Sequence, residues 1–145
     1  MTDPLRKRAL DVLAAAPAKA LAERWDAFEP KPEHQRIRGP ETGLVMVRGR
    51  AGGGGAPFNL GEATVSRASV RIGTGEVGHG YHLGRDHAKA EVIAVIDALR
   101  QHDAARIDQE IITPLATLIA QADTTRREEA AATRVDFFTM VRGDN

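Results

Sequence analysis

Four arginines stand at spacings that a β-strand would turn into shared faces. Arg48 and Arg50 are two residues apart, and Arg67 and Arg71 are four apart. Since side chains alternate across a strand, each pair would lie on one side of its strand. Guanidinium groups so placed can bind a phosphate or phosphonate with two parallel hydrogen bonds, or pair with carboxylates of an acidic partner. Together with Arg85, these four arginines are our candidate contacts to an anion or to a partner protein. We slightly favour a partner protein, because charged side chains on a strand face are more often solvated or ion-paired than bound to a substrate.

The glycine-rich segment RGRAGGGGAPFNLGEAT, residues 48–64, is a second candidate for anion binding. Glycine lets backbone amides come close to a phosphate. However, no Gly-Lys-Ser/Thr follows the glycines and the flanking residues predict strands, so this is not a nucleotide-binding P-loop. The pattern favours a flexible hairpin connection.

Three histidines, His79, His82 and His87, raise the question of a metal site. If residues 76–83 form a strand, His79 and His82 point to opposite faces. His87 and Glu91, four residues apart, would share a helix face, but two ligands do not make a site. We therefore expect no bound metal and favour an exposed helix start. The chain also lacks HExxH and nucleophile-elbow motifs, so no self-contained active site is predicted.

Composition narrows the classes of function. The 145 residues suit one domain spanning 1–145, and 20 basic residues balance 20 acidic ones. No overall field would draw the chain to nucleic acid or an anionic membrane. The chain contains no cysteine, so it cannot itself hold a disulfide or a thiolate-ligated iron–sulfur cluster. The N-terminus lacks a long apolar run, and we expect a cytoplasmic protein.

The elements expected around these residues give an α+β fold. Asp3 and Pro4 resemble an N-cap and first helical residue, and apolar spacing predicts an N-terminal helical hairpin ending before residue 29. Valine-rich segments separated by glycine predict an antiparallel sheet of about four strands, at residues 35–38, 44–50, 64–72 and 76–83. Asp86 would cap a helix reaching residue 102, and a helical piece at 107–112 follows.

The C-terminal part predicts an exposed helix and an apolar tail. Thr113 and Pro114 repeat the cap-and-proline pattern, so we expect a new helix to begin there. Its continuation TTRREEAAATR is polar, and it leads into the tail RVDFFTMVRGDN, residues 134–145. We predict that this tail docks onto a partner, and if it is extended, its two adjacent phenylalanines would face opposite sides. The candidate interface residues are Val135, Phe137, Phe138 and Met140.

The same tail closely resembles the C-terminus of the PhnG family, a subunit of the carbon–phosphorus lyase core complex. Three further blocks resemble it: RGPETGLVMVRGRAGGGGAPFNLGEATVSRASVRI at 38–72, GRDHAKAEVIAVIDAL at 84–99, and the helical N-terminus in its expected place. The resemblance covers essentially the whole chain. It implies that the chain is an accessory subunit required together with PhnI, PhnH and PhnL. The reaction of the complex would transfer methylphosphonate to the ribose C1′ of ATP and release adenine.

The resemblance also implies how cofactors are divided. ATP, with magnesium, is a substrate of the complex, whereas the iron–sulfur cluster and S-adenosylmethionine belong to PhnJ, which later breaks the carbon–phosphorus bond. PhnI is the expected direct partner and carries catalysis, with no catalytic residue assigned here. Two alternatives stay open: a purely structural scaffold without substrate contact, and an isolated nucleotide- or anion-binding module.

Overall fold

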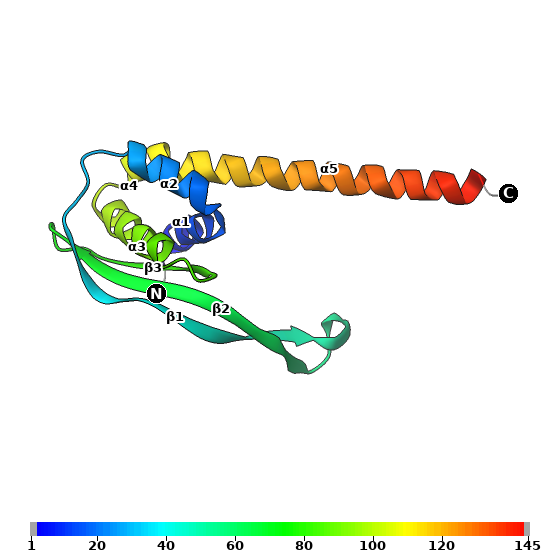
Figure 1. Ribbon diagram of the computed structural model, residues 1–145, viewed down its shortest axis with the longest axis horizontal. Helices are drawn as coiled ribbons and strands as arrows, with labels where there is room; N and C mark the ends of the chain where they lie inside the picture. Colours follow the sequence, from blue (N-terminus) through cyan, green and yellow to red (C-terminus); the bar gives the residue numbers. More distant parts are fainter. Residues whose placement is uncertain (1–2, 144–145) are drawn as a thin grey trace.

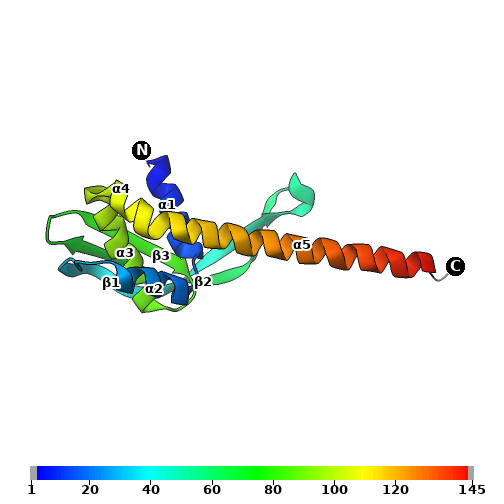
Figure 2. The same cartoon turned by 90° about the horizontal axis from the view of Figure 1, so that it is seen from above.

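The computed structural model describes residues 3–143, with side chains described through residue 134. A three-stranded antiparallel sheet, in the order β1-β2-β3, carries the described helices on one face (Figure 1). A long β-hairpin and the end of the last helix project from this body (Figure 2). The elements are α1 (Pro4–Ala15), α2 (Ala18–Ala27), β1 (His34–Arg50), the 3₁₀ turn η1 (Ala51–Gly53), β2 (Pro57–Ile72), β3 (Val77–Leu83), α3 (His87–His102), α4 (Ala104–Ile107), the π-helical turn η2 (Asp108–Ile112) and α5 (Thr113–Gly143).

The two helix starts predicted at Asp3 and at Asp86 are confirmed. Asp3 Oδ1 accepts a hydrogen bond from the Leu5 amide at 2.9 Å, with Pro4 as the first helical residue of α1. Asp86 Oδ1 accepts from the Lys89 amide at 3.0 Å and so caps α3. In both helices the side chain satisfies an amide that has no partner within the helix. The α+β class is confirmed, and two short helices, α1 and α2, lie at the N-terminus where the sequence predicts them.

β1 is one strand where the sequence predicts two, so the sheet has three strands and the four-strand prediction is wrong. Pairing with β2 continues through residues 38–44, and the register shifts on both sides of Arg38. Gly39 has a φ of 68°, and a Cβ there would lie 2.9 Å from the Arg67 carbonyl oxygen. The Gly39–Pro40 pair, which reads as a turn in sequence, forms a bulge that the strand passes through.

The glycine-rich segment forms the tip of the β1–β2 hairpin, which confirms the hairpin interpretation. Gly52 and Gly53, in the 3₁₀ turn η1, have φ values of 62° and 79°, a region that glycine occupies readily. β2 begins at Pro57, well before the predicted start at residue 64. The hairpin is therefore much longer than the valine-rich runs alone indicated.

β3 lies unusually close to α3. A Cβ added at Gly78 would lie 1.9 Å from the Ala94 carbonyl oxygen, and one at Gly80 would lie 2.1 Å from the Ala90 carbonyl oxygen. The helix presents small side chains to these glycines, with Ala98 one turn after Ala94. Only glycine in the strand allows this approach, which brings the helix backbone onto the sheet.

The buried residues form two adjoining clusters. One lies between α3 and the sheet, and the other lies between α1, α2, α3 and the turn before α5. The largest side chains with almost no exposed surface are Leu13, Leu21, Ile93, Ile96, Ile107, Ile111 and Leu115. α3 contributes to both clusters, so it joins the sheet to the helical layer.

The α-helix α5 begins at Thr113, as predicted, but the chain is already helical before it, so Thr113 does not cap a free helix end. The Thr113 amide donates to the Asp108 carbonyl, five residues earlier, within the π-helical turn η2. Proline has no amide hydrogen, and its ring crowds the carbonyl four residues earlier. A widened turn before Pro114 is a known way to continue a helix past such a residue.

α5 is a 31-residue helix that leaves the body after its first turns (Figure 1). Leu115 is buried, whereas residues 120–134 are exposed throughout, as predicted for the polar stretch. The helix continues to Gly143, so the premise of an extended tail is wrong. The side chains of Val135, Phe137, Phe138 and Met140 lie outside those that the structure describes. Among the described helices, none is both long enough and apolar enough to cross a bilayer.

Candidate functional site

Arg67 and Arg71 share the sheet face opposite α3, as predicted, because the residues between them alternate into the core. Arg67 Nε donates to Glu41 Oε1 at 2.6 Å, and Arg38 Nε reaches the same oxygen at 2.8 Å. The hydrogen bond from Arg67 lowers the pKa of Glu41. Among the described residues Arg71 makes no ion pair. The Arg67 guanidinium is thus occupied by this chain's own carboxylate.

Arg48 and Arg50 share a face of β1, as predicted, but they lie at the far end of the hairpin. Arg48 pairs with Asn59 in β2, eight residues before Arg67. At about 3.4 Å per residue the two arginine pairs are separated by roughly 25 Å. Arg85 lies exposed in the turn before α3. The five arginines therefore do not converge on a single anion.

His79 and His82 face opposite sides of β3, as predicted. His79 Nδ1 lies 2.8 Å from Ser69 Oγ on the exposed face. His82 is 3% exposed, and its Nδ1 and Nε2 lie 2.8 Å and 2.7 Å from the carbonyl oxygens of Leu83 and Asp86. His82 therefore holds the turn between β3 and α3, and it is not available to a ligand at the surface.

The spacing-based pairing of His87 with Glu91 does not form. His87 Nε2 contacts Thr42 Oγ1 on β1, and that hydroxyl lies 3.3 Å from Ser66 Oγ. Ser66 donates to the Gly84 carbonyl at 2.7 Å and has no exposed surface, so a substrate cannot reach it as a nucleophile. In the described part of the chain, no three His, Asp or Glu side chains gather as they would to hold a metal ion.

Glu91 joins α3 to β1 through a cluster that sequence reasoning missed. Its carboxylate lies 2.8 Å from His34 Nε2 and 2.9 Å from Arg36 Nη2. The hydrogen bond from Arg36, followed by that from His34, lowers the pKa of Glu91 against the opposing effect of burial. The two-residue spacing of His34 and Arg36 signals a shared strand face, but nothing in the sequence identifies Glu91 as their partner.

Asp97 is a buried carboxylate at the junction of α1, α3 and β3. Arg6 binds it with two hydrogen bonds, Nε to Oδ1 at 3.0 Å and Nη2 to Oδ2 at 2.8 Å. The backbone amide of His79 also donates to Oδ2, at 2.9 Å. The Asp97 carboxylate raises the pKa of Arg6. Both carboxylate oxygens accept hydrogen bonds within the fold and the residue is buried, so Asp97 has a structural role.

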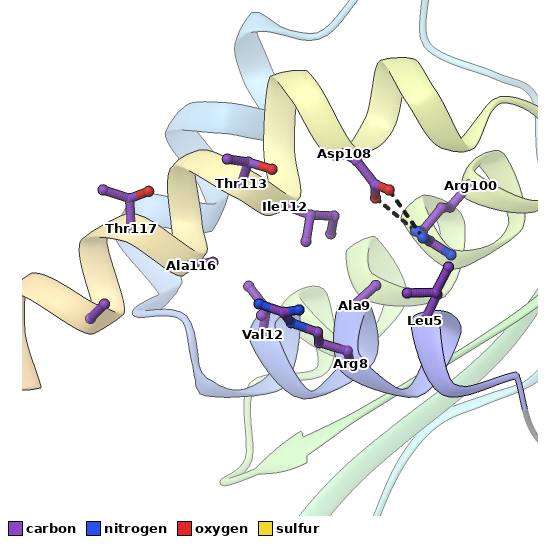
Figure 3. Close-up of a pocket in the computed structure, with 11 residues that line it drawn as sticks. Leu5, Arg8, Ala9, Val12, Arg100, Asp108, Ile112, Thr113, Ala116 and Thr117 are labelled. Atoms are coloured by element: carbon purple, nitrogen blue, oxygen red, sulfur yellow. Dashed lines mark hydrogen bonds and ion pairs between the residues drawn. The ribbon is translucent and has the colours of Figure 1, made fainter.

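A groove of about 440 Å³ runs between α1 and the start of α5 (Figure 3). Arg100 binds Asp108 with two hydrogen bonds, at 2.7 Å and 3.0 Å, at one end of the groove. Arg8 lies on the α1 side, facing Thr113 and Thr117 on α5. These lining residues include neither a nucleophile with an adjacent base nor a pair of carboxylates. The residues that line the groove could bind a ligand or a partner, but they do not include the acid, base and nucleophile that a hydrolytic or group-transfer reaction needs.

Comparisons with known proteins identify what this chain is similar to. The family model described as phosphonate metabolism protein PhnG matches residues 5–143. A curated protein of Rhizobium meliloti (strain 1021), alpha-D-ribose 1-methylphosphonate 5-triphosphate synthase subunit PhnG, is 55% identical over 141 residues. That match covers 97% of this chain and 90% of the relative.

Proposed function

The chain belongs to the PhnG family of phosphonate metabolism proteins, and from this premise we propose that it is a noncatalytic subunit of α-D-ribose 1-methylphosphonate 5-triphosphate synthase. It is required with PhnI, PhnH and PhnL for transfer of methylphosphonate to ATP. The observation that carries this proposal is 55% identity, over 97% of the chain, to a protein named as that subunit. The chain acts in the cytoplasm within a hetero-oligomer, with PhnI as its most direct partner and PhnJ as another.

In the proposed reaction a phosphonate oxygen forms a bond to the ribose C1′ of ATP, the bond from C1′ to adenine breaks, and adenine leaves. Such a substitution needs cations around the triphosphate, including magnesium, and stabilisation of positive charge that develops on the ribose. The five candidate arginines lie apart and Glu41 already binds Arg67. This arrangement supports placing the catalytic groups on PhnI.

We also propose the division of cofactors that the family resemblance implies. ATP and magnesium enter as substrate of the whole complex. The chain has no cysteine, so the iron–sulfur cluster of later carbon–phosphorus cleavage would be held by PhnJ, together with S-adenosylmethionine. We assign no resident cofactor to this chain.

A pure scaffold is the second candidate, favoured by the surface position of the hairpin and of α5. Both candidates are tested by assembling PhnI, PhnH, PhnJ and PhnL with and without this chain, then measuring adenine release and complex size. An intact complex that forms without the chain but releases no adenine supports the proposal. Full release without it would contradict a required role, and failure to assemble would favour the scaffold.

An isolated nucleotide-binding module is the third interpretation. Its sequence basis was the glycine-rich segment, which forms an exposed hairpin tip. Titration of the purified chain with ATP and magnesium tests it. Tight binding to the chain alone would favour the module over the subunit.

A further inference from the structure

A bulge in β1 brings two arginines and a glutamate together on the outer face of the sheet, the face opposite α3. Three steps along β1, from Arg38 to Glu41, match only two steps along β2. Strict alternation would put Arg38 and Glu41 on opposite faces. The extra residue, within Gly39 and Pro40, puts both on the face of Arg67. Bulges commonly redirect side chains next to functional sites, so we examined what else lies beside these three residues.

A cavity of about 290 Å³ is lined by residues of all three strands and of α1. In the ladder Ser69 lies opposite His79. Arg67 lies opposite Tyr81, one pair further along the same face. The lining side chains that carry hydrogen-bonding groups are those of Arg38, Arg67, Ser69, His79 and Tyr81. Among the described residues that line the cavity there is no carboxylate, so its polar groups suit an acceptor-rich ligand.

Glu41 holds two guanidinium groups side by side without neutralising both of them. Its Oε1 lies 2.8 Å from Arg38 Nε and 2.6 Å from Arg67 Nε. One negative charge faces two positive ones, so the group of three keeps a net positive charge. Both contacts are through Nε, and each guanidinium has two further nitrogen atoms that can donate hydrogen bonds. Neighbouring guanidinium groups of this kind bind the oxygens of one phosphate or phosphonate group well.

The β3 side of the cavity adds hydrogen-bond donors of a different kind. His79 Nδ1 lies 2.8 Å from Ser69 Oγ. When this hydroxyl donates to Nδ1, the imidazole carries its proton on Nε2, which then serves as a donor to a ligand. Tyr81 adds a phenolic hydroxyl on the same exposed face. A group with three oxygens on one atom can use more of these donors than a carboxylate can.

We propose that this cavity binds a phosphorus oxyanion, a phosphonate or a phosphate group of a substrate, held chiefly by Arg38 and Arg67. His79 and Tyr81 are further donors to the same group. The site rests on the geometry described above, whereas the choice of a phosphorus oxyanion rests on the proposed function. Such binding gives the chain a direct contact with substrate, which a pure scaffold lacks. The two arginine side chains are 59% and 53% exposed, so the chain alone binds the anion weakly, with a dissociation constant on the order of millimolar.

Titration of the full chain with methylphosphonate, inorganic phosphate and ATP, followed by NMR, tests the site. The amide signals of residues 67–69 and 79–81 should shift in a saturable way. Arg67→Gln should weaken methylphosphonate binding at least tenfold, because it removes charge-assisted hydrogen bonds. Arg71→Gln is the matched control on the same strand and face. Arg71 lies about 13 Å further along β2, beyond the screening length of about 8 Å at physiological salt, so its loss should change affinity less than about twofold.

Tyr81→Phe and a second anion sharpen the test. The variant removes one hydroxyl and leaves the contacts of Glu41 in place, and we expect about threefold weaker binding of methylphosphonate. Acetate should bind the unchanged chain at least tenfold more weakly than methylphosphonate, because it offers fewer oxygens and less charge. Acetate that binds as tightly as methylphosphonate would overturn the ligand class and favour an acidic side chain of a partner.

The remaining outcomes also decide the proposal. No saturable shift with any of the three phosphorus compounds overturns it, as does an equal effect of Arg67→Gln and Arg71→Gln. Tighter binding of ATP than of methylphosphonate supports it and assigns the site to the triphosphate, whereas the reverse order supports it and assigns the site to the phosphonate. Full adenine release by the complex without this chain would contradict the proposed function while anion binding stays measurable, so the two failures are distinguishable.

Discussion

The same two strands, β1 and β2, behave differently in the body of the sheet and in the outer half of their hairpin, residues 44–64, which we call the hairpin arm. In the body, Val70 and Ala68 are almost fully buried beneath α3, and β3 glycines bring the helix backbone onto the sheet. In the arm, Val47 and Leu60 are exposed although their residue types would suit a core. Strand-forming residues therefore specify the ribbon, and the presence of a covering layer decides whether it is a core or a surface.

The largest effect is expected from a substitution that disturbs the close contact between strand β3 and helix α3. Gly78→Ala places a methyl group where the Ala94 carbonyl oxygen lies 1.9 Å away, and a backbone atom cannot yield as a side chain can. We expect at least about 3 kcal/mol lower free energy of unfolding in urea. The control is Gly43→Ala, where no heavy atom lies within 4 Å of the new Cβ. An equal loss at both positions would show that strand glycines matter for another reason.

The next effect concerns the buried ion pair that holds α1 against the body. Arg6→Met leaves the 1% exposed Asp97 side chain without its guanidinium. We expect the free energy of unfolding to fall by about 3 kcal/mol, because a buried carboxylate then lacks its counter-ion. Lys7→Met, which breaks the exposed pair with Asp11 on the same helix, should have no measurable effect. Similar thermal melts for the two variants would contradict this distinction.

The third prediction asks whether α5, which projects from the body as the arm does, is a docking element. We expect Phe137→Ala with Phe138→Ala to weaken PhnI binding well beyond tenfold, because truncated aromatic side chains at interfaces commonly cost about 2 kcal/mol or more. The body should remain folded by circular dichroism. Thr124→Ala with Thr125→Ala, on the exposed part of the same helix, is the control. Retained PhnI binding in a pull-down would remove the tail from the interface.

The smallest effect is a pH dependence at the α3–β1 contact. The pKa of Glu91 is lowered in the fold, chiefly by Arg36, so the carboxylate stabilises the fold above its unfolded pKa. This stabilisation disappears as pH falls through the lowered folded value. Glu91→Gln should therefore have a lower melting temperature at pH 7, and the difference from the unchanged chain should shrink near pH 3. A difference that stays constant with pH would show that shape, and not charge, is responsible.

Local sequence signals predicted much of the fold. The Asp3 and Asp86 caps, the two N-terminal helices and the opposite faces of His79 and His82 all followed from helix and strand periodicity. The failures occurred where a strong local signal was overridden. Gly39–Pro40 reads as a turn but sits in a bulge that pairing with β2 carries through, and Thr113–Pro114 reads as the capped free end of a helix but directly follows helical residues.

The candidate site was less predictable because its features depend on contacts between distant residues. Alternation correctly put Arg67 with Arg71 and Arg48 with Arg50, but it could not show that Glu41 occupies Arg67. The meeting of Arg38 and Arg67 at Glu41 also escaped sequence reasoning. The bulge at Gly39 and Pro40 changes which residues of β1 share a side, and the two-residue period does not report such a change.

The π-helical turn before Pro114 sets the direction in which α5 presents its sides. A regular helix turns by about 100° per residue, so one additional residue in a turn rotates everything after it by that angle about the helix axis. The turn at residues 108–112 therefore sets the rotation of α5 about its own axis relative to the helical residues that precede the turn. Sequence changes that restore a regular α-helical turn there would leave each residue of the projection intact while aiming it at a different neighbour.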